Sequence, residues 1–176
     1  MKKISNIDIS TIAILSASAC IGRLALSAIP SIELFIPIII LSSAYFQGYY
    51  GILISIITVL TSNIFLGQGP WTLWQIVCCV LVSVFAHLIF FKKKYKITSL
   101  NLCLASLLLI FLVYSPIINL LSIIFYFPSV NKELITTYFL SSLPFDVLHS
   151  ISCAAFVFML NKPFKLIKDK FTNPTK

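Results

Sequence analysis

The chain has 176 residues, of which 59% are hydrophobic and only 10% charged, its net charge is +8 and its mean hydropathy is +1.03. A water-soluble domain of this size needs a polar surface that so few charged residues cannot supply, so the composition excludes a soluble globular fold. Repeated apolar stretches of about 20 residues match the thickness of a bilayer instead, and we expect one integral membrane domain over residues 1–176.

The apolar stretches predict six helices in chain order. They cover residues 8–29, 34–47, 50–66, 72–91, 99–127 and 134–160, and a basic tail follows at 161–176. Helices are required because lipid offers no partner to unpaired backbone N–H and C=O groups, and the alternation typical of barrel strands is missing. The second stretch is short and contains Pro37, so we expect it to be tilted or irregular. The expected fold is an all-α membrane bundle with six transmembrane helices.

The positions of the cations predict that both termini are cytoplasmic, because Lys and Arg near a helix end are retained on that side. Three basic clusters precede the first helix, fill the break after the fourth and follow the sixth: Lys2, Lys3, Lys92, Lys93, Lys94, Lys96, Lys162, Lys165, Lys168 and Lys170. The breaks on the opposite side contain only Glu33, Lys132 and Glu133 as full charges. The net positive charge therefore indicates topology and leaves little for a nucleic-acid partner to explain.

The chain has no recognisable catalytic, metal or cofactor motif. Its five cysteines all lie in apolar stretches without a C-x-x-C pair, so we interpret them as packing residues, neither disulfides nor metal ligands. The run Gly67-Gln68-Gly69 lacks the following Gly-Lys-Ser/Thr of a phosphate-binding loop. We expect neither an enzyme nor a resident cofactor.

Residues 62–75, SNIFLGQGPWTLWQ, interrupt the apolar pattern on the side opposite the cations. Trp71 and Trp74 alone would fit an interfacial aromatic belt. The amides beside them, Asn63, Gln68 and Gln75, do not fit it, because uncharged amides at the membrane edge are costly unless something satisfies them. Aromatic faces with a few amides suit a pocket for a planar, polar-edged molecule, so we interpret these five residues as substrate-binding candidates.

Three further polar residues lie inside predicted helices. Arg23, near the outer end of the first helix, either snorkels to the surface or points inward to bind a ligand or to pair with Glu33 or Asp146. Asp146 and His149 share one face of the sixth helix and are either a structural pair or ligand contacts. Metal binding would need another ligand, and the remaining histidine, His87, belongs near the opposite end of the bundle.

Three stretches of the chain carry a resemblance to a known family: IGRLALSAIP (21–30), SNIFLGQGPWTLWQ (62–75) and SLPFDVLHS (142–150). Together with the length and the six predicted helices, they resemble the substrate-binding S components of energy-coupling factor (ECF) vitamin transporters, most of all the branch associated with cobalamin. The chain departs from that branch at residues 47–51, QGYYG, and at Leu73, where relatives carry a Gly-Pro turn and a second proline.

The resemblance implies a protein that captures a vitamin outside the bacterial cell membrane and docks on a membrane coupling subunit with two cytoplasmic ATPases. The cavity would lie near the extracellular face, closed by the first and third loops. The family's docking signature, A-x-x-x-A, matches Ala13 and Ala17, whose spacing also allows close approach of a partner backbone. Packing within the bundle is the alternative. Cobalamin or a related corrinoid is the expected substrate, with pyridoxine or a queuosine precursor as alternatives.

Two other classes of protein remain open. A non-transporting scaffold of the rod-shape MreD type shares the six-helix size and would need no ligand pocket. A small membrane-embedded enzyme would use Asp146 and His149 as an acid-base pair, although no nucleophile, metal set or phosphate cradle accompanies them.

Overall fold

A computed structural model describes residues 5–90 and 97–172, and within these ranges the chain is helical and contains no strand. The elements are α1 (Asn6–Ala25), α2 (Phe35–Tyr45), α3 (Gly48–Leu66), α4 (Trp71–Phe90), α5 (Ser99–Leu109), the π-helical segment η1 (Ile110–Tyr114), α6 (Ser115–Tyr126) and α7 (Lys132–Thr172). Five helices are long and apolar enough to cross a membrane, namely α1, α3, α4, the continuous helix Ser99–Tyr126 and α7. The prediction of an all-α fold with membrane-length helices is confirmed at this level.

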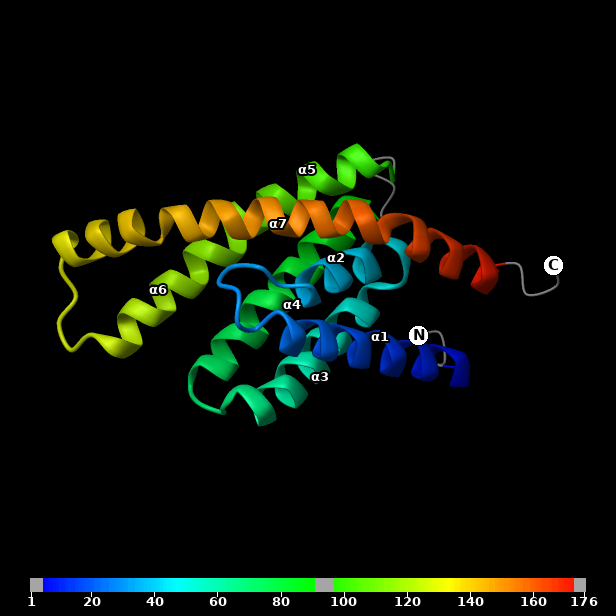
Figure 1. The fold of residues 1–176 in the computed structure, drawn as a ribbon, viewed down its shortest axis with the longest axis horizontal. Helices are drawn as coiled ribbons and strands as arrows, with labels where there is room; N and C mark the ends of the chain where they lie inside the picture. Colours follow the sequence, from blue (N-terminus) through cyan, green and yellow to red (C-terminus); the bar gives the residue numbers. More distant parts are fainter. Residues whose placement is uncertain (1–4, 91–96, 173–176) are drawn as a thin grey trace.

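The helix ends gather at two opposite ends of the molecule (Figure 1). At one end α1 begins, α4 ends, α5 begins and α7 ends. We call it the basic end, because the last part of α7 brings Lys162, Lys165, Lys168 and Lys170 there. Loop 26–34 and turn 67–70 lie on the opposite side, which we call the loop end, and the α6–α7 hairpin with turn 127–131 extends beyond them. The remaining basic residues of the topology prediction lie outside the described ranges: Lys2, Lys3, Lys92, Lys93, Lys94 and Lys96.

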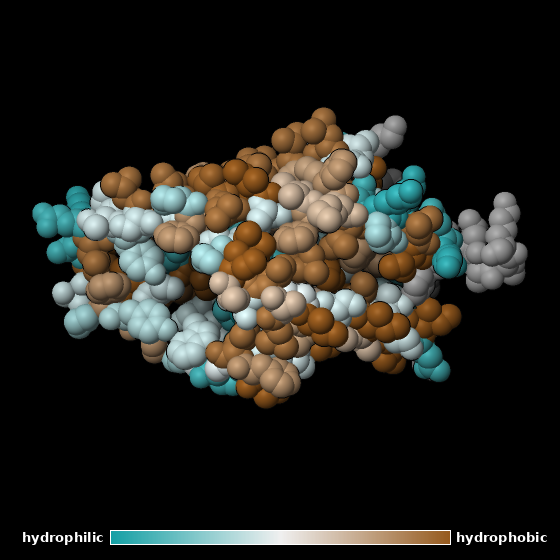
Figure 2. All heavy atoms as spheres, viewed as in Figure 1, coloured by the Kyte–Doolittle hydropathy of each residue, from teal (hydrophilic) through white to brown (hydrophobic). Residues whose placement is uncertain are grey.

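The surface agrees with a membrane environment. Figure 2 shows hydrophobic residues across the middle of one face and hydrophilic residues mainly toward the two ends. Large apolar side chains point outward on several helices, including Ile14 and Ile21 on α1, Phe65 on α3 and Leu140 on α7, each more than 60% exposed. Contact of such side chains with lipid tails is favourable, whereas their exposure to water would be unfavourable.

Helix α2 is short and completely buried. Its 11 residues extend about 16 Å, roughly half the hydrocarbon thickness of a bilayer. Every one of them is buried, because α1, α3, α4 and α7 all pack against it. We expected a tilted or irregular helix here, and the backbone of α2 is regular. Pro37 lies in the first turn, where a backbone N–H has no acceptor within the helix, so the proline removes no hydrogen bond.

The predicted helix 99–127 is one continuous helix with a π segment in its middle. The segment, Ile110–Tyr114, ends two residues before Pro116. A proline inside a helix has no N–H to donate and its ring clashes with the carbonyl four residues earlier, here that of Leu112. Wider π-helical hydrogen bonding relieves that clash. Tyr114, the last residue of this segment, is buried.

Helix α7 runs unbroken for 41 residues through Pro144 and Pro163. We expected it to end at residue 160 and a basic tail to follow, but the tail is helical as far as Thr172. Hydropathy marks where apolar residues end, whereas the helix continues because Phe164 is buried and Ile167 packs against the core. The Lys168 ammonium also lies 5.4 Å from the centre of the Tyr45 ring, a cation-π contact to α2.

A close three-helix contact near the basic end gives the first prediction. The Ser43 and Ser83 hydroxyls of α2 and α4 are 2.9 Å apart, and a Cβ built at Gly51 of α3 would collide with both. Gly51→Ala should therefore destabilise the protein by about 1–3 kcal/mol, measured as a lower melting temperature in detergent. The matched control is Thr61→Ala, an exposed site on the same helix. Equal melting temperatures for both variants would show that the contact can relax.

Candidate functional site

Arg23 points into the bundle at the loop end and does not snorkel to the surface. It is 6% exposed, and its Nη1 donates hydrogen bonds to Ser62 Oγ at 2.6 Å and to Asn63 Oδ1 at 3.0 Å. Its guanidinium also lies 4.8 Å from the centre of the buried Phe35 ring. Among the described residues no carboxylate forms an ion pair with it. The pairing with Glu33 or Asp146 that we considered is therefore not observed. The buried charge is held by neutral oxygens and an aromatic face.

Three of the predicted amides form a network with Arg23. Asn63 Nδ2 donates to Thr72 Oγ1 at 2.9 Å and to Gln75 Oε1 at 3.0 Å. Thr72 in turn donates to Gln68 Oε1 at 3.2 Å, and Gln68 Nε2 donates to the Leu60 carbonyl at 3.2 Å. The network therefore ties the end of α1 to the end of α3 and the start of α4.

The network also provides hydrogen-bond partners for the polar amides at the membrane edge. Asn63 uses its carbonyl on Arg23 and its NH₂ on two side chains, so its hydrogen-bonding capacity is largely filled by the protein itself. Arg23, by contrast, uses only Nη1 in these bonds, and its other N–H donors remain. Among the network residues, Arg23 has the most capacity left for a ligand.

A cavity of about 210 Å³ lies beside Arg23. It is formed under loop 26–34 and is lined by Arg23, Glu33, the hydroxyl residues Ser27 and Ser31, and the aliphatic side chains of Leu26, Ile29, Pro30, Ile32 and Leu66. Its walls are therefore mixed, with polar and aliphatic side chains in similar measure and with one cationic and one anionic side chain among them. Loop 26–34 is one of the two loops that the resemblance leads us to expect over a ligand, whereas no residue of turn 67–70 lines this cavity.

Loop 26–34 is attached to α7 by two contacts. Ser152 Oγ donates to the Ser31 carbonyl at 3.1 Å, and His149 Nε2 lies 3.6 Å from Glu33 Oε2. Ser31 has a φ of 62°, a left-handed conformation that costs a non-glycine residue energy. The loop is thus held over the cavity in a strained shape by the helix that carries His149.

Glu33 and His149 both keep hydrogen-bonding capacity in reserve. Glu33 Oε2 and His149 Nε2 are buried and, among the described residues, neither has a hydrogen-bond partner. His149 is 8% exposed and its ring meets that of Tyr114 edge-on, with centroids 5.3 Å apart. The π segment thus fixes one side of the imidazole. Buried polar atoms without partners are costly, which makes them candidates for ligand contact.

Asp146 belongs to a different cluster. Its Oδ2 accepts hydrogen bonds from Asn119 Nδ2 and Ser142 Oγ, each at 2.9 Å, and the bond from Asn119 joins α6 to α7. His149 therefore faces Glu33 and not Asp146, so the geometry gives no support to an acid-base pair of Asp146 and His149. His87 lies near the basic end, with Nδ1 3.3 Å from the Ser43 carbonyl. Among the described residues no group of three His, Cys, Asp or Glu side chains could hold a metal ion.

The two tryptophans have different surroundings. Trp71 is 37% exposed and its ring lies directly over Gly69, where a Cβ would collide with it. Trp74 is half-buried and packs edge-on against Phe125 of α6, with centroids 6.4 Å apart. Its Nε1 is buried and has no hydrogen-bond partner among the described residues. Neither residue lines the 210 Å³ cavity. The aromatic-belt interpretation therefore suits Trp71 best, and Trp74 remains the better ligand candidate.

A conservative substitution separates these roles. Trp74→Phe keeps an aromatic ring but removes the unpartnered N–H, whose burial costs about 1–3 kcal/mol. We expect unchanged or higher thermal stability. If that N–H donates to a ligand, affinity should fall several-fold, as measured by equilibrium binding to the purified protein. Trp71→Phe is the matched control and should change neither quantity. Unchanged affinity in Trp74→Phe would assign Trp74 to packing alone.

Ala13 and Ala17 lie on the outer face of α1. Both are exposed, whereas Ile12, Leu15, Ser16 and Ala19 face the bundle. Packing within the chain, which was the alternative interpretation of their spacing, therefore does not occupy them. They remain available to lipid or to a partner helix.

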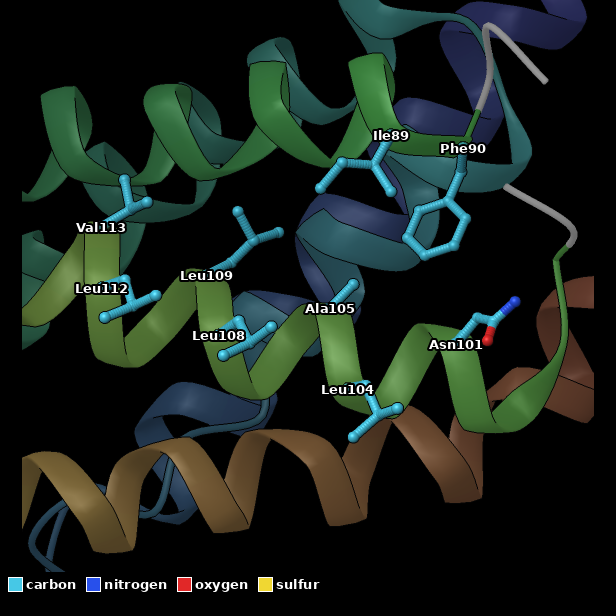
Figure 3. A pocket seen from close by; sticks show the side chains of 9 residues that line it. All are labelled: Ile89, Phe90, Asn101, Leu104, Ala105, Leu108, Leu109, Leu112 and Val113. Carbon is cyan, nitrogen blue, oxygen red and sulfur yellow. The ribbon is translucent and has the colours of Figure 1, made fainter. Parts of the chain in front are cut away.

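A second and larger cavity, of about 500 Å³, lies between the end of α4 and the α5–η1 helix (Figure 3). Figure 3 shows Ile89 and Phe90 of α4 facing Leu104, Ala105, Leu108, Leu109, Leu112 and Val113, with Asn101 at one end. This lining is almost wholly apolar and includes none of the predicted site residues. It offers a polar solute very few hydrogen-bonding groups, so the smaller cavity is the better candidate site.

Sequence reasoning missed several residues of these clusters. Ser62, Thr72, Ser142 and Asn119 complete the two hydrogen-bond networks, and Glu33 was considered only as a partner for Arg23. One signal was present for Asn119, since a polar amide within an apolar stretch needs a partner. No protein-family model matches the chain, and comparison with curated proteins gives no match.

Proposed function

We propose that the chain is the substrate-binding S component of an ECF-type importer in the bacterial cell membrane. The observation that carries the proposal is the cavity under loop 26–34, with Arg23 and Glu33 in its walls and His149 behind Glu33. A small cavity with convergent polar groups at one end of a helical bundle is what a solute-binding subunit requires. The three stretches that carry the family resemblance also contribute to this end of the molecule.

The proposed topology has six spans, with α2 as a short central one, and both termini in the cytoplasm. The lysines of α7 at the basic end and the sparsely charged loop end support it. In that orientation the cavity faces outside, where a vitamin would be captured. Delivery would use a membrane coupling subunit and two cytoplasmic ATPases, since the chain itself has no nucleotide-binding motif.

The volume of the cavity bears on which vitamin is carried. Pockets for drug-sized ligands are about 300–1,000 Å³, and 210 Å³ lies below that range. A corrinoid such as cobalamin would enter only after loop 26–34 had moved away. A smaller ring, such as pyridoxine or a queuosine precursor, would require a smaller movement of the loop.

Co-purification and uptake test the proposal together. The chain should co-purify with a coupling subunit and two ATPases expressed in the same cells, and proteoliposomes of the assembly should accumulate the ligand only when ATP is supplied. A chain that neither assembles nor supports ATP-dependent uptake would favour the MreD-like scaffold. Turnover of a substrate by the isolated chain would favour the enzyme.

A further inference from the structure

We propose that the cavity under loop 26–34 binds a small, planar, uncharged heterocycle that presents a carbonyl oxygen to Arg23 and N–H donors to Glu33. The proposal rests on the proposed function only for its setting, since binding by the isolated chain can be tested without a transport partner.

The charges of the cavity limit the charge of its ligand. Arg23 and Glu33 line the same small cavity. Arg23 supplies N–H donors, and Glu33, whose side chain is 31% exposed, supplies a carboxylate. An anionic ligand would be repelled by Glu33 and a cationic one by Arg23. A ligand of zero net charge with an acceptor on one edge and donors on another satisfies both.

The remaining walls distinguish a neutral ring from a zwitterion. Leu26, Ile29, Ile32 and Leu66 supply aliphatic surface around the charged pair. Two full charges would lose hydration in so small a space, and pairing offsets that cost only when its geometry is very good, whereas an amide-like edge loses far less. A flat ring instead places its faces on the aliphatic side chains and its polar edge on Arg23 and Glu33. The volume of 210 Å³ limits it to about one or two rings.

The reserve capacity of Glu33 and His149 supports the same ligand. Glu33 Oε2 faces His149 Nε2 at 3.6 Å, too long for a hydrogen bond, and neither atom has a partner among the described residues. A donor edge bound to Glu33 would move the carboxylate by a small amount and allow His149 to donate to it. Loop 26–34 would then be fixed to α7 more firmly when the ligand is present.

The test uses the purified chain in lipid nanodiscs and 2-aminopyrimidin-4-one as the probe, with affinity measured by equilibrium dialysis. Glu33→Gln should weaken binding about tenfold or more, because a hydrogen bond to a carboxylate is lost. Glu133→Gln is the matched control, an exposed acid on α7, and should bind as the parent does. Melting temperatures of both variants show whether they fold.

A second probe tests the pairing itself. Pyrimidin-4-one lacks the 2-amino group, so the parent protein should bind it about tenfold more weakly than 2-aminopyrimidin-4-one. The Glu33→Gln variant should discriminate between the two probes less than the parent does, because an amide oxygen is a weaker acceptor for the amino group than a carboxylate. Equal affinity of the parent for both probes would overturn the proposal. Stronger binding of zwitterionic leucine, or tight binding of cyanocobalamin unchanged by Glu33→Gln, would overturn it too.

The two proposals fail separately. A chain that assembles with the coupling subunit but ignores the pyrimidinone probes would remain an S component with a different ligand. A chain that binds the probe through Glu33 but never assembles would retain the site and lose the assigned role in transport.

Discussion

Replacing Arg23 with methionine should destabilise the loop end and abolish ligand binding. Methionine fills much of the same space but leaves Asn63 Oδ1 without the donor that holds it at 3.0 Å, and it removes the charge from Phe35. The loss of hydrogen bonds from a buried charged group predicts a decrease of about 3 kcal/mol in the free energy of unfolding. Thermal unfolding in detergent checks the value, with the exposed Lys162→Met as the control.

Arg23→Lys tests which part of the guanidinium acts on the ligand. Both hydrogen bonds to the protein come from Nη1, so a single ammonium with three donors can replace them. Little donor capacity would then remain for the cavity. The lysine variant should therefore melt close to the parent but bind ligand at least tenfold more weakly. A lysine variant that binds as tightly as the parent would show that the guanidinium does not contact the ligand.

Enlarging Ala13 and Ala17 to tryptophan should separate ligand capture from transport. Both alanines are exposed on the outer face of α1, so the larger side chains disturb no packing within the chain. A partner helix that approaches closely at small residues would be held away by several ångströms. We expect unchanged melting temperature and ligand affinity, loss of co-purification with the coupling subunit, and at least a tenfold decrease in uptake.

The control for this experiment is Ala155→Trp. Ala155 is also an exposed alanine, on α7, and makes no part of the proposed docking face. It should assemble and transport as the parent does. If the double variant at Ala13 and Ala17 also assembles normally, α1 does not dock there. If Ala155→Trp loses assembly and uptake to the same extent, the cause is added side-chain volume on the outer surface of the bundle and not these two positions.

Helix positions in the membrane could be predicted well from hydropathy, because each long apolar stretch had to be a helix in lipid. The start of α1 also has a local signal. Ser5 and Asp8 form a capping box, in which each side chain binds the other residue's backbone N–H. Hydropathy did not predict the end of α7. Lysines alternate there with Phe164 and Ile167 and lower the mean hydropathy of the segment. That segment is an amphipathic continuation of α7. Its helical periodicity indicates a helix, although its mean hydropathy does not.

The candidate site was less predictable than the fold. The sequence indicates that Arg23 and Asn63 are expensive in a membrane, but not that they satisfy each other, because they are 40 positions apart and meet only when α1 packs against α3. The spacing of Asp146 and His149 places them on one face, yet each binds a different element: Asp146 contacts α6, and His149 contacts loop 26–34. Helical periodicity determines direction, whereas the partner depends on tertiary packing.

The complete burial of α2 has a consequence for how the protein is made. An 11-residue apolar segment is too short to be released into the bilayer as an independent span, so α2 must enter together with its neighbour α3. Its buried surface also packs against α7, which is synthesised only after α3, α4, α5 and α6. Until α7 has been synthesised, one side of α2 lacks a protein neighbour, and the centre of the bundle closes only once α7 is in place.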